Sequence, residues 1–162
     1  MTNTSSALLT VFGLAFAAAP ALAAPVDAYA PLMRLQGRWS VTSGAGKTIT
    51  LENRCAQTGL FLACEQVVDG TPAALVVFLP RGETKDGIIY RTQALRADGA
   101  TPGPWYGLTI KGDDWIYAPI DKARDRTLNH FSGADHIHFE TQTSSDGVTW
   151  TTQTSGDEVR LP

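Results

Sequence analysis

Apolar and polar positions alternate with a period of two along most of the chain. In the segment 135–143, Ile137 and Phe139 share one face, whereas His136 and His138 share the other. This period is typical of a β-strand that has one buried face. Because the apolar sides of such strands must be covered, the pattern predicts a sheet with a hydrophobic interior.

Runs of this kind recur between clusters of Gly, Asp and Pro. They predict strands at Gly37–Thr42, Thr48–Cys55, Leu60–Val68, Ala73–Leu79, Ile88–Leu95, Tyr106–Lys111, Asp114–Ala118, Arg126–His130, Asp135–Thr143, Thr149–Thr154 and Glu158–Leu161. Asp69-Gly70, Gly112-Asp113 and Asp146-Gly147 supply residues that tolerate the positive φ of tight hairpins. Since a long antiparallel meander with free edges is prone to aggregation, the pattern favours an all-β, up-and-down antiparallel barrel of about 8–10 strands.

Two segments depart from this alternation. Asp27–Leu35 has helical spacing, with Tyr29 and Leu32 on its apolar face, and predicts one short N-terminal helix. Ala73–Leu79 is apolar on both faces, so its outer side needs a cover. That cover is expected to be either the N-terminal helix or a second copy of the chain in a homodimer.

The first residues predict export. An uncharged apolar run, Ala7–Ala19, leads into the small-residue site Ala21-Leu22-Ala23-Ala24. We expect residues 1–23 to be a cleaved signal peptide and residues 24–162 to form one domain in the periplasm or outside the cell; a short membrane anchor is the competing interpretation. The run of about 13 residues is too short to span a bilayer, and no later run is longer. The net charge of −3, with both signs scattered, predicts no nucleic-acid partner.

The two cysteines, Cys55 and Cys64, lie close together in the sequence. In an oxidising compartment this spacing predicts a disulfide that joins two strands across a hairpin with Thr58-Gly59 in its turn. A redox-active pair is the alternative, but the spacing is far from Cys-x-x-Cys. The disulfide is therefore expected to be structural.

The histidines are candidate metal ligands. His136 and His138 project from one side of a strand, Glu140 follows on the same side, and His130 precedes them. Two imidazoles and a carboxylate can bind zinc. The alternative, a solvent-facing polar surface opposite Ile137, is favoured, so no cofactor is predicted.

No motif commits the chain to a reaction. The segment 43–48 looks like the end of a phosphate-binding loop, but it lacks the first glycine of that motif and continues as a strand. The acidic pairs Asp113-Asp114 and Asp157-Glu158 are expected at turns, where water solvates them and their pKa values stay ordinary. An enzyme is therefore not the favoured class.

Aromatic and polar strand residues indicate a binding site instead. A barrel of eight to ten strands has an interior wide enough for side chains or one small ligand. Strand aromatics are usually core residues, and an apolar pocket with a few polar groups is the alternative. The candidate ligand-binding residues are Trp39, Gln66, Tyr90, Arg91, Trp115 and Asn129.

Several segments resemble a bacterial family of exported lipocalin-like, calycin-type barrels of unknown function. These are Leu35-Gln-Gly-Arg-Trp39, Cys64–Gly70, Leu108–Trp115, Asn129–Gly133 and Ser145–Trp150. The resemblance implies a barrel that Trp39 closes at one end, with a late-strand arginine stacked over it. Arg160 is the residue expected in that position, with Arg126 as a substitute.

The sequence thus predicts an exported barrel protein that binds a small apolar or amphipathic molecule without catalysis. Three alternatives stay open. They are a haem or metal-binding barrel, an enzyme acting on a lipid or envelope component, and a barrel packed shut that serves a structural role.

Overall fold

The computed structural model describes residues 26–120 and 124–162. The predicted signal peptide, residues 1–23, lies outside the described residues. Within the described ranges, no helix is long and apolar enough to cross a membrane.

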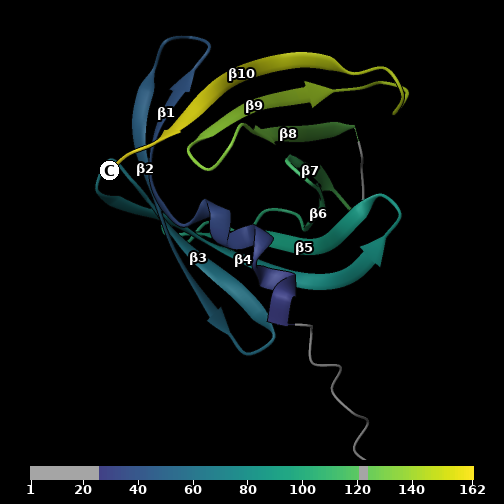
Figure 1. Ribbon diagram of the computed structural model, residues 1–162. Coiled ribbons are helices and arrows are strands. Elements are labelled where there is room, and N and C mark those ends of the chain that lie inside the picture. The colour runs from purple at the N-terminus through teal and green to yellow at the C-terminus, as the bar shows by residue number, and fades with distance from the viewer. Residues whose placement is uncertain (1–25, 121–123) are drawn as a thin grey trace, which may run out of the picture.

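Ten antiparallel strands form a closed barrel, each hydrogen-bonded to its neighbours in the chain, and β1 pairs with β10 to complete the ring. Figure 1 shows this ring of strands. The strands are β1 Gly37–Ser43, β2 Thr48–Thr58, β3 Phe61–Val68, β4 Thr71–Thr84, β5 Gly87–Arg96, β6 Tyr106–Lys111, β7 Asp114–Pro119, β8 Asp125–Phe131, β9 His136–Thr143 and β10 Thr151–Arg160. The predicted all-β up-and-down barrel is confirmed.

The last strand differs from the prediction. The sequence indicated two short strands with a break before Glu158, but β10 runs without interruption from Thr151 to Arg160. A register irregularity between Thr152 and Thr154 absorbs one residue against β9. Gly156, within the expected break, pairs with both neighbouring strands, and Ser155 pairs with β9. The paired ladders on both sides of the strand outweigh the low strand propensity of glycine.

The N-terminal segment forms two short 3-10 helices in place of the single predicted helix, η1 Val26–Tyr29 and η2 Pro31–Leu35. Pro31 occupies the first turn of η2, where its missing N–H leaves no helical hydrogen bond unmade. Leu32 of η2 is fully buried and Tyr29 nearly so, both in the core. In Figure 1 the two helices lie across the ring of strands.

Because η1 and η2 lie across the ring of strands, they do not cover the outer face of β4, as one of the two predictions had it. On the outer face Leu75 pairs with Leu95 of β5, and the two side chains are 39% and 38% exposed. The helices close an end of the barrel because their apolar residues pack against inward-facing side chains. A second copy of the chain as the cover stays a prediction.

The turn between β3 and β4 follows the predicted chemistry, whereas Asp146-Gly147, predicted to form a tight hairpin, lies in a longer loop between Thr143 and Thr151. Asp69 and Gly70, which join β3 to β4, have φ values of 48° and 80°. This left-handed pair is the form that a two-residue hairpin requires. Gly59, in the hairpin that joins the two cysteine-bearing strands, also has a positive φ.

Candidate functional site

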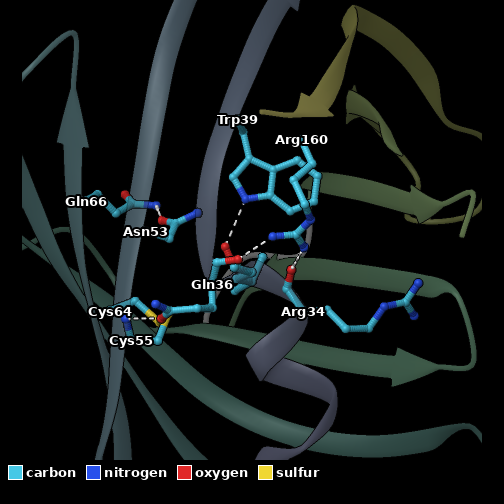
Figure 2. Close-up of a disulfide and its surroundings, with 9 residues drawn as sticks. Arg34, Gln36, Trp39, Asn53, Cys55, Cys64, Gln66 and Arg160 are labelled. Atoms are coloured by element: carbon cyan, nitrogen blue, oxygen red, sulfur yellow. Dashed lines mark hydrogen bonds between the residues drawn. A yellow bond between two sulfur atoms is a disulfide. The ribbon is translucent and has the colours of Figure 1, made fainter. Parts of the chain in front are cut away.

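One end of the barrel is closed by the segment that leads into β1. Trp39 Nε1 donates a hydrogen bond to Leu35 O at 3.0 Å. The Arg160 guanidinium, from the end of β10, donates to Gln36 O at 2.5 Å and to Arg34 O at 2.9 Å. Figure 2 shows both side chains reaching toward this segment from the strands above it. These contacts attach both the first and the last strand to the backbone of residues 34–36. We call this end of the barrel the capped end.

The disulfide lies beside the same segment. Cys55 and Cys64 face each other directly in the β2–β3 ladder and are bonded, as the sequence predicted. The Cys55 backbone N–H donates to Gln36 Oε1 at 2.6 Å, as Figure 2 shows. Cys64 is only 1% exposed and belongs to the hydrophobic core, against which Cys55 packs. Its position supports the structural role predicted for it.

Large side chains fill the barrel next to the capped end. The fully buried members of this layer are Leu32, Trp39, Leu62, Cys64, Tyr90, Leu108, Trp115, Phe131 and Ile137. The Tyr90 hydroxyl donates to Ala28 O, and burial raises the pKa of Tyr90 to about 12. The rings of Trp115 and Phe131 pack with centroids 4.6 Å apart. Of the predicted ligand-binding residues, Trp39, Tyr90 and Trp115 therefore belong to this packed layer.

Trp115 and Asn129 face each other across β7 and β8. Trp115 Nε1 and Asn129 Oδ1 are buried, and neither has a hydrogen-bond partner among the described residues. A buried polar atom without a partner costs about 1–3 kcal/mol. A donor and an acceptor this close in register are suited to hold one bridging hydroxyl group or water.

The remaining predicted residues are placed apart from one another. Gln66 Nε2 donates to Asn53 Oδ1 at 3.1 Å, on the β2–β3 wall. Arg91 follows the fully buried Tyr90 in β5 and is exposed. Because successive strand residues point to opposite faces, Arg91 lies outside the barrel and does not line its lumen. The structure therefore does not gather the six predicted residues into one site.

Among the described residues, none closes the half of the lumen away from the capped end. Val76, Tyr117 and Thr127 point into the barrel there and are partly exposed, which means that water enters from this end. A cavity of about 480 Å³ lies at this opening. Its lining includes inward-facing residues of five strands and part of the β5–β6 loop: Val76, Thr92, Gln93, Ala94, Arg96, Gly103, Pro104, Tyr106, Tyr117 and Thr127. The volume falls in the range of small-molecule sites.

A row of hydroxyl groups crosses one wall of the open half. Tyr117, Thr127, Thr141 and Thr154 are successive register partners on β7, β8, β9 and β10. The Thr141 and Thr154 hydroxyls are hydrogen-bonded to each other. Val76 and Ala94, which pair across β4 and β5, add apolar surface to the cavity, and Thr92 and Arg96 of β5 add further polar groups. The cavity lining therefore combines apolar and polar groups, which suits an amphipathic molecule.

The position of Glu158 in the structure differs from the predicted one. The sequence placed the Asp157-Glu158 pair at a turn, but both residues lie inside β10, where they pair with β1 and β9. Glu158 is opposite Val41 on one side and the buried Ile137 on the other, so its side chain points into the barrel. Burial raises the pKa of Glu158 to about 7. The pairing of β10 with β1 and β9 decides this placement, and the local sequence does not show that pairing.

Tyr117 is a second inward-facing group with a shifted pKa. It lines the cavity and is only partly exposed, and burial raises its pKa well above the ordinary value. The charge of Glu158 raises the Tyr117 pKa further. Glu158 and Tyr117 were not among the predicted site residues. The signal was present for Glu158, because a period of two puts it on the same face as Arg160, which was expected to point inward.

The three histidines lie on the outer surface. Asp114, His130, His138 and Asp157 are successive register partners on β7–β10. His130 Nδ1 lies 2.6 Å from Asp114 Oδ1, and His138 Nδ1 lies 3.0 Å from Asp157 Oδ1. His136 Nε2 contacts the same Asp157 oxygen at 3.1 Å. In the described part of the chain, no three His, Cys, Asp or Glu residues are grouped in a way that could hold a metal ion.

Comparison with known proteins assigns this chain to no family. No protein-family model matches the chain, and no curated protein matches it. The chain is similar to a solved structure described as "Crystal Structure of Rv2717c from M. tuberculosis", with 14% sequence identity and a TM-score of 0.45. The match covers 85% of this chain and 99% of that one. The lipocalin-like resemblance stays a prediction from the sequence.

Proposed function

We propose that this protein binds a small apolar or amphipathic molecule in the open half of its barrel. The cavity of about 480 Å³ at the barrel opening is the observation that carries this proposal. The ten-stranded wall around it is rigid, because every strand is hydrogen-bonded on both sides. A preformed cavity of this kind costs little ordering free energy when a ligand enters.

The groups that line the cavity suit both parts of such a ligand. Val76 and Ala94 offer apolar surface for a hydrocarbon portion, while Thr92, Thr127 and Tyr117 offer polar groups. Burying an apolar group against Val76 and Ala94 gains roughly 25 cal/mol per Å². The hydroxyl groups allow a polar part of the ligand to keep its hydrogen bonds.

Binding of the neutral fluorescent probe N-phenyl-1-naphthylamine tests this proposal. Ala94 and Leu95 are adjacent in β5 and face opposite ways: Ala94 lines the cavity, and Leu95 is exposed on the outer surface. We expect Ala94→Trp to fill the opening and weaken probe binding at least about tenfold. Leu95→Trp is the matched control and should bind as the unaltered protein does. A probe that fails to bind, or that binds Ala94→Trp equally well, would contradict the proposal.

Export is part of the same proposal. The disulfide between Cys55 and Cys64 supports a function in the periplasm or outside the cell, because cytosolic thiols are kept reduced. The mass of the protein recovered from the periplasmic fraction of an expressing bacterium tests this placement. The expected mass is that of a chain beginning near residue 24, less two hydrogens for the disulfide. A full-length chain retained in the membrane fraction would favour the anchor instead.

A further inference from the structure

Glu158 is an inward-facing carboxyl group without a partner. Its register partners, Val41 and Ile137, are apolar. No hydrogen bond or ion pair joins the Glu158 side chain to any group of the described residues, and burial is the sole cause of its raised pKa. The side chain is partly exposed, and a carboxylate that loses part of its water without gaining a partner is destabilised. A partner supplied from outside the chain would remove that cost.

The basic groups that come nearest along the barrel wall are already engaged. Arg160 lies two residues further along the same face of β10, but its guanidinium is hydrogen-bonded to Gln36 O, Arg34 O and Ala134 O. Arg96 lines the cavity, but it forms a 2.5 Å ion pair with Asp98. Neither Arg160 nor Arg96 therefore forms an ion pair with the Glu158 carboxyl group.

Aromatic rings line the cavity and also lie on the inner face of the strand next to Glu158. Tyr106 and Tyr117 line the cavity, and the charge of Glu158 contributes to the raised pKa of Tyr117. Phe139 occupies the inner face of the adjacent strand, where its ring packs over Gly156. The faces of such rings attract cations and accept hydrocarbon surface equally well. A carboxylate next to aromatic rings is a combination that recognises organic cations.

We propose that the lumen ligand is an amphipathic amine, a molecule with one positive charge and an apolar body, and that Glu158 pairs with its ammonium group. This inference rests on the proposed lumen-binding function and narrows the class of ligand. One unpaired carboxylate matches one positive charge. An anionic lipid or fatty acid would place a second negative charge beside Glu158, and a metal ion would need further carboxylates that its apolar neighbours do not supply.

Three probes with the same hydrocarbon chain separate these possibilities: decylamine, decanol and decanoate. Binding of each to the disulfide-intact protein is measured by calorimetry at pH 8, where Glu158 is ionised. We expect decylamine to bind at least about tenfold more tightly than decanol, and decanoate to bind most weakly. In Glu158→Gln, which keeps the shape and removes the charge, decylamine should lose this advantage while the affinity for decanol stays within about twofold.

Glu83→Gln is the matched control. Glu83 is exposed near the end of β4. It carries the same charge as Glu158 outside the lumen, so its loss should leave the order of the three probes unchanged. The melting temperature of each variant is recorded first, so that a folding defect is recognised. A pH series on the unaltered protein adds a test without substitution: decylamine should bind progressively more weakly from pH 8 to pH 5, as Glu158 takes up a proton.

The outcomes distinguish the two proposals. Equal affinities for decylamine and decanol would overturn the amine inference and leave the lumen-binding function in place. Tighter binding of decanoate would overturn it as well, because Glu158 would then act as a neutral hydrogen-bond donor. Failure of all three probes to bind would overturn both proposals. Loss of the amine preference in Glu83→Gln would show a general charge effect and would also contradict the role of Glu158.

Discussion

The Cζ atom of Arg160 lies 4.1 Å from the centroid of the Trp39 ring, although the two residues are at opposite ends of the folded domain's sequence. They are direct register partners where β1 meets β10 and closes the barrel. Trp39 is fully buried, and Arg160 covers it from the capped end. The pair therefore joins the closure of the barrel to the attachment of the segment that caps it.

Arg160→Met is expected to destabilise the protein by about 2–3 kcal/mol, because it removes the cation–π contact and leaves backbone carbonyls without donors. Arg160→Lys should lose less, since lysine keeps the charge but lacks the planar fork of donors. Urea unfolding followed by tryptophan fluorescence measures both. Arg91→Met is the control, because Arg91 is exposed on the outer face of β5. A loss for Arg160→Met as small as that of the control would refute a closing role for the pair.

Reduction of the disulfide should lower the free energy of unfolding by about 2.5–3 kcal/mol. Cys55 and Cys64 are separated by 9 residues, and the value is the loop-closure entropy expected for so short a loop. Urea unfolding with and without dithiothreitol measures the difference. The double variant Cys55→Ala and Cys64→Ala is the control, since dithiothreitol should have no effect on it. An unfolding curve unchanged by reduction would contradict the prediction, because it would mean that the disulfide does not change the free-energy difference between the folded and unfolded states.

Glu158 should make stability depend on pH. Its pKa is about 7 in the folded protein, against an ordinary value of 4.5 for an unfolded chain. The folded state therefore binds the proton more tightly, so the contribution of this group to stability is full below pH 4.5 and is lost as pH rises to about 7. Relative to Glu158→Gln, the unaltered protein should lose roughly 2–3 kcal/mol across this interval. Chemical denaturation at pH 4.5, 6 and 8 measures the difference. A difference that does not change with pH would contradict the raised pKa.

Gly156→Ala is expected to destabilise the protein by about 2–3 kcal/mol through overpacking. A Cβ atom at this position would lie 2.3 Å from Thr42 O and 2.6 Å from a carbon of the Phe139 ring. Neither the paired backbone nor the enclosed ring can move away freely. Gly107→Ala is the matched control in β6, because its Cβ would meet nothing nearer than Ala118 O at 3.8 Å. Thermal unfolding compares the two, and equal melting temperatures would show that Phe139 rotates out of the way.

Much of the fold could be predicted from local patterns. The period-two alternation placed Ile137 inside the barrel and His136 and His138 outside, and the structure agrees. Asp69-Gly70 marked a tight hairpin because few residue pairs tolerate two successive positive φ values. The disulfide was predictable from the short spacing of its two cysteines. Each of these inferences depends on residues that are close together in the sequence.

The candidate site could not be predicted in the same way. Whether an inward-facing residue is packed or borders an open lumen depends on which end of the barrel the η1–η2 segment closes. That is decided by contacts such as Arg160 Nη2 to Arg34 O, which join residues 126 positions apart. Tyr90 and Trp115 therefore became core, and Tyr117 became part of the cavity wall, although all three are aromatic strand residues with similar surroundings in the sequence.

The sequence by itself determined most of the strands, the Asp69-Gly70 turn, the alternation of inward and outward faces and the disulfide, because these follow from residue periods and short-range stereochemistry. The tertiary structure alone decided that β10 is continuous, that Glu158 has apolar register partners, and that the described residues close one end of the barrel. The physical reason is that ladder pairing and burial are properties of neighbours brought together from distant segments. A carboxyl group has an ordinary pKa or a raised one according to those neighbours, and its place in the sequence does not reveal them.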